Sequence, residues 1–350
     1  MPGDLHSWIA RRLPLNTHPP TPLSLDPAGR SFLVTGGAGF IGSHIVRRLV
    51  DGGARVRVLD LLTTGRRENL AGGLEQIDLI VGDICDLETV RRAVDGVEYV
   101  LHLAALASVP QSIDDPDLNF RVNLGGTHNL LLAARDAAVR RFVFSSSAAV
   151  YGLQPAPHHE RLAPQALSPY AAAKLGSEQL CQAFTQAYGL PAVCLRYFNV
   201  FGPYQNPRSD YAAAIPIFIS RLLHGQSPRV FGDGLQSRDF VYVANVVEAN
   251  LSACSADAAI GGVFNIGTGR ETNLLELLAI LKELTGQTVA PEFDAPRAGE
   301  VRHSYSDIRQ AVTQLGYRLE IDLAEGLRQT VEWYRRHGAG FWDRSATGRP

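Results

Sequence analysis

The stretch "SFLVTGGAGFIGSHIVRRLVDGG" (residues 31–53) decides the fold of this chain. Its apolar start predicts a β-strand that ends at a cluster of glycines. After that cluster, Ile41, Ile45 and Leu49 recur at helical spacing, and a pair of glycines ends the predicted helix. A strand that passes through a glycine turn into a helix is the first half of a βαβ unit.

The glycine turn has the spacing of a dinucleotide-binding motif. Gly36, Gly39 and Gly42 allow a tight turn, let the backbone approach a pyrophosphate, and place it at a helix N-terminus. Asp60 ends the next predicted strand, near the spacing of roughly 20 residues at which an acid accepts from ribose hydroxyls. Such an acid would repel a 2′-phosphate. The sequence therefore predicts NAD rather than NADP, although two arginines follow a few residues downstream.

Beyond this unit, short apolar runs alternate with helical stretches. Apolar strands joined through helices form parallel sheets with both faces covered. We therefore predict an α/β fold, a Rossmann-type doubly wound parallel sheet with a smaller α/β C-terminal substrate lobe, because the alternation breaks after Gly202. The expected parts are a leader over 1–30 with a short helix near Leu5–Arg12, an NAD-binding domain over 31–199 with returning segments at about 236–267, and a mostly substrate-binding, interleaved lobe over 200–340.

The composition is that of an ordinary soluble globular protein. The chain has 350 residues, of which 45% are hydrophobic and 19% charged, and its net charge is −2. This balance predicts no nucleic-acid or membrane-surface partner. No apolar run approaches the ~18–20 residues of a membrane span, and the first thirty residues lack the apolar core of a signal peptide. The four scattered cysteines indicate reduced thiols, no metal site and a cytoplasmic location.

A second motif, "SPYAAAK", carries reactive groups. Tyr170 and Lys174 stand four residues apart on a predicted helix, so both side chains project from one face. A tyrosine with a pKa of about 10 becomes a base at neutral pH when a lysine ammonium and a nicotinamide cation lower that pKa. Ser147 ends the predicted strand "RRFVFSSS" at the edge where such sheets bind ligands, where it can donate to a carbonyl oxygen and pass a proton to Tyr170.

Taken together, the motifs over 31–340 resemble the extended short-chain dehydrogenase/reductase family, specifically its NAD-dependent nucleotide-sugar 4-epimerases of the UDP-glucose and UDP-N-acetylglucosamine type. The motifs that carry the resemblance are "TGGAGFIG", "HLAA", "SSSAAVYG", "YAAAK", "RYFNVFGP" and "GDGLQSRDF". The resemblance implies a catalytic triad of Ser147, Tyr170 and Lys174, tightly held NAD and a homodimer.

The cofactor residues follow from the glycine motif, from strand ends and from this resemblance. Asp83 ends the third predicted strand, where an acid either holds the adenine amino group, is a solvated strand end, or caps the next helix. The small residues of "HLAA" let the backbone pass close to a flat cofactor, and His102 is expected to be a packed, non-catalytic histidine. The full predicted set is Gly36, Gly39, Phe40, Ile41, Gly42, Asp60, Asp83, Ile84, Leu103, Ala104, Ala105, Tyr170 and Lys174.

Substrate residues are implied by the resemblance. Arg238 and Arg297 would hold the pyrophosphate of a UDP-sugar with bidentate geometry, and Glu300 would bind the uridine ribose. Ser304 stands where glucose- and galactose-restricted relatives carry a tyrosine, so it leaves room for a 2-acetamido group. The full predicted set is Ser108, Ser147, Tyr170, Asn199, Val230, Phe231, Arg238, Arg297, Glu300 and Ser304.

The residues after Ser147 discriminate among reactions. The related 4,6-dehydratases carry an Asp-Glu pair where this chain has Ala148 and Ala149, and those acids drive the elimination of water. The sequence therefore predicts reversible C4 epimerisation of UDP-GlcNAc/UDP-GalNAc and also UDP-Glc/UDP-Gal through a 4-keto intermediate. The alternatives are a UDP-glucuronate 4-epimerase and, less favoured, a dehydratase, a decarboxylase or a non-catalytic NAD-binding protein.

Overall fold

A computed structural model describes residues 25–72, 74–207, 213–296 and 301–338. Its centre is a seven-stranded parallel sheet in the order β11-β6-β5-β4-β1-β2-β3. The strands are β1 (Ser31–Thr35), β2 (Arg55–Asp60), β3 (Ile77–Val81), β4 (Tyr99–His102), β5 (Arg141–Ser147), β6 (Ala192–Tyr197) and β11 (Val263–Ile266). The strand order reverses between β1 and β4, and ligands bind such sheets at this switch point.

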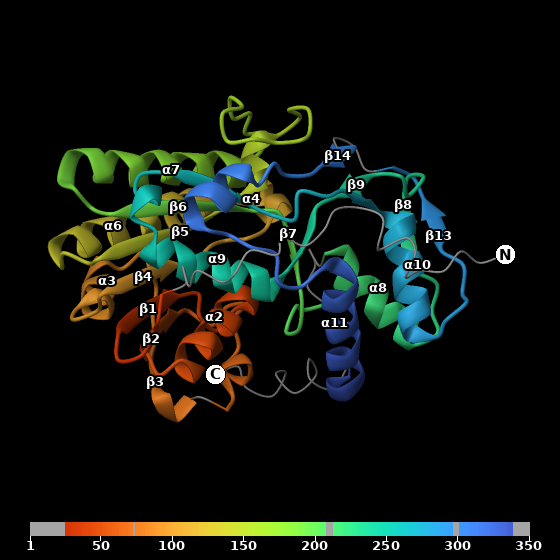
Figure 1. Ribbon diagram of the computed structural model, residues 1–350, viewed down its shortest axis with the longest axis horizontal. Coiled ribbons are helices and arrows are strands. Elements are labelled where there is room, and N and C mark those ends of the chain that lie inside the picture. The colour runs from red at the N-terminus through yellow and green to blue at the C-terminus, as the bar shows by residue number, and fades with distance from the viewer. Residues whose placement is uncertain (1–24, 73, 208–212, 297–300, 339–350) are drawn as a thin grey trace.

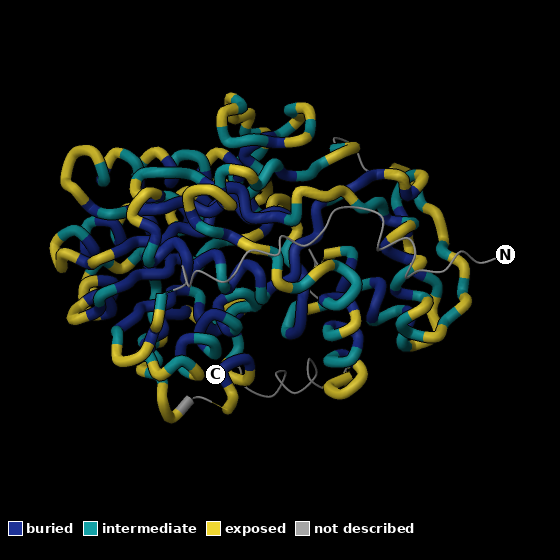
Figure 2. The backbone as a smooth tube through the Cα atoms, viewed as in Figure 1, coloured by how far each residue is buried: buried dark blue, intermediate teal, exposed yellow. Residues whose placement is uncertain are grey.

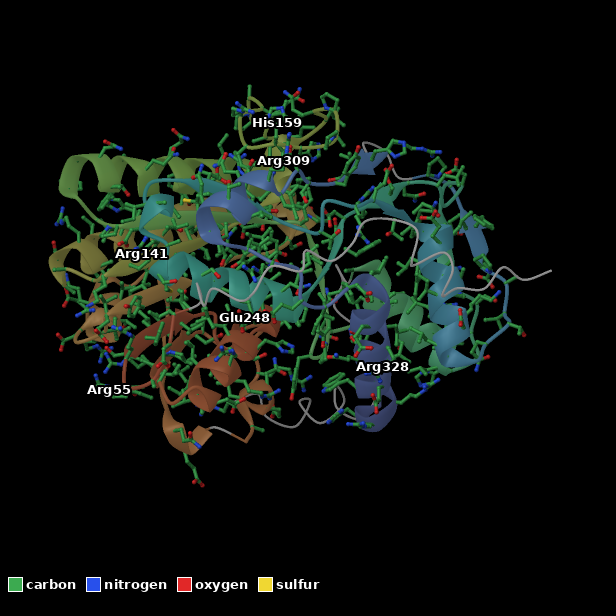
Figure 3. The ribbon with its side chains drawn as sticks, viewed as in Figure 1. Arg55, Arg141, His159, Glu248, Arg309 and Arg328 are labelled. Atoms are coloured by element: carbon green, nitrogen blue, oxygen red, sulfur yellow. The ribbon has the colours of Figure 1, made fainter. Side chains whose placement is uncertain are left out.

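Helices cover both faces of the sheet (Figure 1). One face carries α2 (Phe40–Asp51) and α9 (Val243–Ser255), and the other carries α3 (Leu87–Val94), α6 (Gly126–Asp136) and α7 (Pro169–Tyr188). The Glu248 carboxylate of α9, labelled in Figure 3, accepts from Arg48 Nε of α2 at 2.8 Å. The predicted fold class is therefore confirmed.

Burial follows the apolar pattern of the strands. The buried stretches of the backbone run along the sheet, and exposed residues gather in the loops and on the outer helix faces (Figure 2). Phe32 and Val34 of β1 pack toward α2 and α9, whereas Leu33 packs toward α3 and α6, because successive strand residues point to opposite faces. Three of the four free cysteines are buried and Cys85 is partly exposed.

A second, smaller lobe lies at the right in Figure 1. Its helices α8, α10 and α11 enclose a separate apolar core that includes Phe218, Leu277 and Leu327. The elements of this part are β7 (Asn199–Phe201), α8 (Ala214–Leu223), β8 (Arg229–Phe231), β9 (Ser237–Arg238), β10 (Phe240–Tyr242), β12 (Thr272–Asn273), α10 (Leu274–Thr285), β13 (Glu292–Asp294), β14 (His303–Ser304) and α11 (Leu323–His337).

Short helices complete the described chain. The α-helices are α4 (Val109–Asp114) and α5 (Pro116–Asn119), and the π-helices are η3 (Phe120–Gly125) and η6 (Ala311–Leu315). The 3-10 helices are η1 (Arg67–Leu70), η2 (Leu74–Gln76), η4 (Ala148–Tyr151) and η5 (Asp257–Ala259). None of the described helices has the length and apolar character that crossing a bilayer requires.

The two lobes are interleaved. The chain leaves the sheet after β6, builds part of the second lobe, and returns to the sheet through α9 and β11. Within the expected leader, Leu25 packs against the apolar core on the α2 and α9 face of the sheet, and Gly29 N donates to Gly53 O at 3.0 Å. The short helix predicted near Leu5–Arg12 lies outside the described residues.

Candidate active site

The first turn of α7 places the reactive tyrosine. Ser168 caps the helix by accepting from Ala171 N at 3.1 Å, and Pro169 at the first helical position has the backbone angle that a helix start needs. Tyr170 therefore stands in the first turn, and Lys174 follows one turn later on the same face.

The structure brings the three predicted catalytic residues together. Ser147 ends β5, where its hydroxyl accepts from Ala149 N at 3.2 Å, and the same hydroxyl lowers the pKa of the neighbouring Tyr170 phenol. The buried Lys174 Nζ donates to Ser145 O at 2.8 Å and lies 5.9 Å from the centre of the Tyr170 ring. A proton can pass between the two hydroxyls beside a buried ammonium group.

Burial dominates the charge states of this group. It lowers the pKa of Lys174 to about 8, against the opposing effect of Glu178. Burial also raises the pKa of Tyr170 and outweighs the lowering by the hydrogen bond with Ser147. This direction is opposite to the one expected from the sequence, because burial is the largest effect on the phenol. The Lys174 ammonium group donates to the Ser145 carbonyl.

The glycine turn is as compact as its spacing predicts. Gly36 has φ +68°, and a Cβ there would lie 2.7 Å from Ala104 N of the neighbouring strand end. A Cβ on Gly42 would lie 2.1 Å from Gly36 O. The cap residue of α2 is Gly39, which has no side chain to occupy the helix N-terminus. The residues present therefore fit a pyrophosphate held by backbone N–H groups.

Asp60 stands beside this turn. Its carboxylate accepts from Ala38 N at 2.9 Å and from Leu62 N at 2.8 Å, so its orientation is fixed. Burial raises the pKa of this carboxyl, and the two backbone hydrogen bonds oppose the rise. Each oxygen has a second lone pair that can accept from a ribose hydroxyl.

The end of β4 borders the same space. Leu103, Ala104 and Ala105 are partly exposed, although β4 itself is buried. His102 is buried between Thr35 Oγ1, at 2.8 Å, and Thr127 Oγ1, at 2.9 Å, and burial lowers its pKa to about 3. It is the packed histidine expected from the sequence.

The remaining cofactor candidates differ in their burial and in their hydrogen-bond partners. Asp83 Oδ1 accepts from Cys85 N at 2.9 Å, while Asp86 caps α3, so the alternative cap role for Asp83 is wrong. Ile84 is buried against Gly126. Phe40 and Ile41, in the first turn of α2, are half-buried and pack toward the second lobe's core.

Two of the predicted substrate residues lie on paired strands, and a third lies on β7 of the separate β10-β7 sheet. Arg238 of β9 and Ser304 of β14 are register partners, so their side chains share one face of a small sheet. Asn199 of β7 is exposed, and its backbone N donates to Asp239 O at 3.0 Å. Arg297 and Glu300 lie outside the described residues.

The other substrate candidates are partly engaged by the protein itself. Val230 is fully buried in the second core, so its backbone is the part that can meet a ligand. Phe231 O already accepts from Gln236 Nε2 at 2.7 Å. Ser108 is buried and caps α4 by accepting from Gln111 N at 3.1 Å.

Comparison with known proteins now decides the family. Residues 32–267 match the model of the "NAD dependent epimerase/dehydratase family". The chain belongs to that family. It is accordingly an NAD-dependent enzyme, as the glycine turn and Asp60 predicted.

Named relatives of this family member fall into two groups. A UDP-glucose 4-epimerase of Mycolicibacterium smegmatis is 41% identical over 87% of this chain and 98% of its own. The solved structure of a UDP-N-acetylglucosamine 4-epimerase from Methanobrevibacter ruminantium is 38% identical, with a TM-score of 0.85 over 89% of this chain and 100% of its own. A dTDP-glucose 4,6-dehydratase of an Actinoplanes strain is 37% identical over 87% of this chain and 97% of its own.

Two residues at the site of this epimerase/dehydratase family member escaped the sequence analysis. Ser112 of α4 accepts from Tyr170 N at 3.1 Å and so anchors the start of the catalytic helix. Asp239 is fully buried and accepts from Thr268 and Ser306. Ser112, one turn into the short helix α4, gives no sequence signal, but the carboxylate directly before the apolar run "FVYV" does.

Proposed function

We propose that this protein catalyses reversible epimerisation at C4 of a UDP-hexose, with UDP-GlcNAc/UDP-GalNAc and UDP-Glc/UDP-Gal as substrates. The observation that carries the proposal is the Ser147–Tyr170–Lys174 cluster followed by Ala148 and Ala149. The cluster can move a proton at a sugar hydroxyl, and the alanines offer no acid or base to eliminate a leaving group. The two named epimerase relatives support this choice over the dehydratase.

In the proposed reaction, Tyr170 takes the proton of the sugar 4′-hydroxyl, directly or through Ser147. Bound NAD would supply the reversible acceptor for the C4 hydride. The Lys174 ammonium, 5.9 Å from the centre of the Tyr170 ring, and the positive charge of bound NAD would together favour the phenolate against the effect of burial. After the 4-keto sugar turns its other face to the site, C4 would regain the hydride on that face while Tyr170 returns the proton to the oxygen, and the opposite C4 configuration results.

Rotation of the 4-keto sugar requires that the protein bind the nucleotide tightly and the sugar weakly. The nucleotide must stay bound while the sugar rotates, so binding energy has to come from the UDP portion. Arg238 and Asn199 stand on strands of the second lobe, apart from the proton-transfer pair on β5 and α7. This separation supports firm contacts to the diphosphate and few contacts to the sugar.

Acceptance of acetylated sugars rests on Ser304. Its side chain is small and partly exposed, and it lies in register with Arg238, the proposed diphosphate ligand. A 2-acetamido group next to the diphosphate therefore meets a hydroxyl rather than a bulky ring. The relative from Methanobrevibacter ruminantium, a UDP-N-acetylglucosamine 4-epimerase, supports this inference.

The test is a substrate panel followed by NMR of the anomeric signals. Purified protein is incubated with UDP-GlcNAc and, separately, with UDP-Glc, without added NAD. We expect UDP-GalNAc and UDP-Gal to appear until equilibrium is reached. Absence of both products would sink the proposal.

The same panel separates the rival functions. Faster conversion of UDP-glucuronate than of the neutral sugars would favour a glucuronate epimerase, which needs a basic group for the C6 carboxylate. A 4-keto-6-deoxy product from a nucleotide sugar would make the protein a dehydratase despite Ala148 and Ala149.

A further inference from the structure

A second charged pair lies beneath the proposed triad. Glu178 of α7 is 0% exposed and stands one turn beyond Lys174 on the same helix face. Its Oε1 accepts from Arg196 Nε at 2.8 Å and its Oε2 from Arg196 Nη2 at 2.7 Å. Arg196, on β6, is 3% exposed. Because the desolvation of two buried charges cancels most of their Coulomb attraction, the Glu178–Arg196 pair adds little to the stability of the fold. A contribution to stability therefore does not by itself explain why the pair is present.

The Glu178 carboxylate also reaches the strand that carries Ser147. Ser146 Oγ donates to Glu178 Oε1 at 2.5 Å, and Ser146 directly precedes Ser147 on β5. One carboxylate therefore ties together the helix that bears Tyr170 and Lys174, the strand that bears Ser147, and β6 beside it. Because charge-assisted hydrogen bonds are short and strong, the spacing between helix and strand is held closely.

The groups that face Lys174 come from four elements. Tyr170, Glu178 and Cys181 lie on α7, and His102, at the end of β4, is influenced by the Lys174 charge. Strand β5 presents the Ser145 carbonyl and the Phe144 ring, whose centre lies 4.9 Å from Nζ, and β6 presents Arg196 behind Glu178. Among these groups, the one carboxylate is that of Glu178.

We propose that Glu178 is a positioning residue for the reaction: it keeps Lys174 in its ammonium form and fixes the catalytic helix against the strand of Ser147. The expected effect of Glu178 on turnover rests on the proposed function. The effect of Glu178 on the charge of Lys174 does not, because the titration of Lys174 is measured without substrate.

The sequence makes that measurement direct. The chain contains two lysines, Lys174 and Lys282, so protein labelled with ¹³C at the lysine ε-carbon gives two side-chain signals. Lys282→Arg assigns them by removing one. Titration of the wild type from pH 6 to 11 is expected to show the Lys174 midpoint at about 8.

The informative variant is the double substitution Glu178→Gln with Arg196→Met. It removes both buried charges, so neither is left unpaired, and it keeps the volume of both side chains near the original. We expect the Lys174 midpoint to fall by one pH unit or more. We also expect kcat to fall at least tenfold with KM little changed, and the alkaline limb of the kcat profile to move to lower pH.

The matched control is Glu248→Gln with Arg48→Met, which removes the α2–α9 ion pair on the opposite face of the sheet. This control should leave the Lys174 midpoint and kcat unchanged. An unchanged Lys174 midpoint in the Glu178→Gln/Arg196→Met protein, with wild-type kcat, would overturn the inference and leave the pair with a purely structural role.

If that double variant does not fold, Ser146→Ala decides. It cuts the link between α7 and β5 without unpairing a charge, and a severalfold lower kcat at unchanged NAD content supports the inference, whereas wild-type kcat overturns it. A wild-type protein inactive on every UDP-sugar would contradict the proposed function instead. The titration would still show whether Glu178 affects the Lys174 midpoint.

Discussion

At the residue scale, Tyr170 carries the proposed proton transfer. Replacing it by phenylalanine removes the hydroxyl whose pKa Ser147 lowers and leaves the ring in place. We expect kcat to fall by about 10²–10⁴, the usual contribution of a general acid–base group, or below detection. Calorimetry with UDP should give an unchanged Kd, since the proposed nucleotide contacts lie in the second lobe.

Tyr188→Phe is the matched control, because Tyr188 ends the same helix and is 57% exposed. It should retain full turnover. Turnover of Tyr170→Phe within tenfold of the wild type would exclude the phenol as the acid–base group.

A second residue-scale prediction concerns His102 and acid stability. Its folded pKa is about 3, below the unfolded value of about 6.5, so below pH 6.5 the unfolded chain binds a proton that the folded protein does not. Stability is therefore lost as pH falls from 6.5 toward 3, by about 1.4 kcal/mol per pH unit from this residue. His102→Gln should make the slope of unfolding free energy against pH shallower by that amount.

Urea unfolding of both proteins at pH 7, 6 and 5 measures the two slopes. The value at pH 7 serves as the control for stability lost through the changed hydrogen bonds to Thr35 and Thr127. Parallel slopes would show that His102 is not held neutral in the folded protein.

The residues of the candidate site differ in how well they can be predicted from the sequence. Tyr170 and Lys174 share a helix face by spacing alone, and Asp60 follows from the strand and glycine pattern. Glu178 repeats the same four-residue step, but its meaning depends on Ser146 and Arg196, which come from two other strands. Contacts between distant segments are the part that sequence periodicity does not encode.

At the scale of elements, the turn between β1 and α2 is the most constrained. In Gly42→Ala the added Cβ would meet Gly36 O at 2.1 Å, so α2 must shift away from the strand. We expect a stability loss of about 1–3 kcal/mol from overpacking, and a purified protein with little bound NAD. Absorbance and mass of the released nucleotide give the NAD content.

Gly189→Ala is the control for the cost of a glycine replacement. Gly189 ends α7 with φ +70°, and a Cβ there meets nothing within 4 Å. The variant should lose about 1 kcal/mol from the left-handed conformation and keep its NAD. Full NAD content in Gly42→Ala would contradict the role given to the turn.

Long elements were predictable and short ones were not. The seven sheet strands and α7, with Ser168 at its start and Gly189 at its end, follow the apolar period and the cap residues. Strands β9, β12 and β14 have two residues each, too few to show a period of two. They form through the backbone partners that the fold brings to them, such as Arg238 with Ser304.

At the scale of the whole molecule, Asp239 joins separate parts of the chain. Its carboxylate accepts from backbone and hydroxyl groups of Thr268 and Ser306 and from Gly269 N, at 2.5–3.1 Å. Asp239→Asn places an amide NH₂ against donors, so at least one hydrogen bond becomes a repulsive contact. Because the neighbouring strands carry Arg238 and Ser304, UDP affinity should fall tenfold or more.

NAD content should stay unchanged in this variant, since the glycine turn lies in the other lobe. Calorimetry with UDP and the nucleotide-release assay measure the two quantities. Asp78→Asn, which changes an exposed carboxylate paired with Arg57, is the control. Equal loss of NAD and UDP in Asp239→Asn would indicate general unfolding rather than a displaced substrate strand.

The return of α9 and β11 to the sheet bears on how such an enzyme could acquire a new specificity. The strands that carry the proposed substrate residues come from two separate stretches of chain, one before β11 and one after it, and β9 pairs with both β12 and β14. A graft of one stretch from a relative would meet a foreign partner in the other. Chimeras should therefore exchange both stretches together around an unchanged β11, and specificity in this protein is inherited in pairs of segments rather than one at a time.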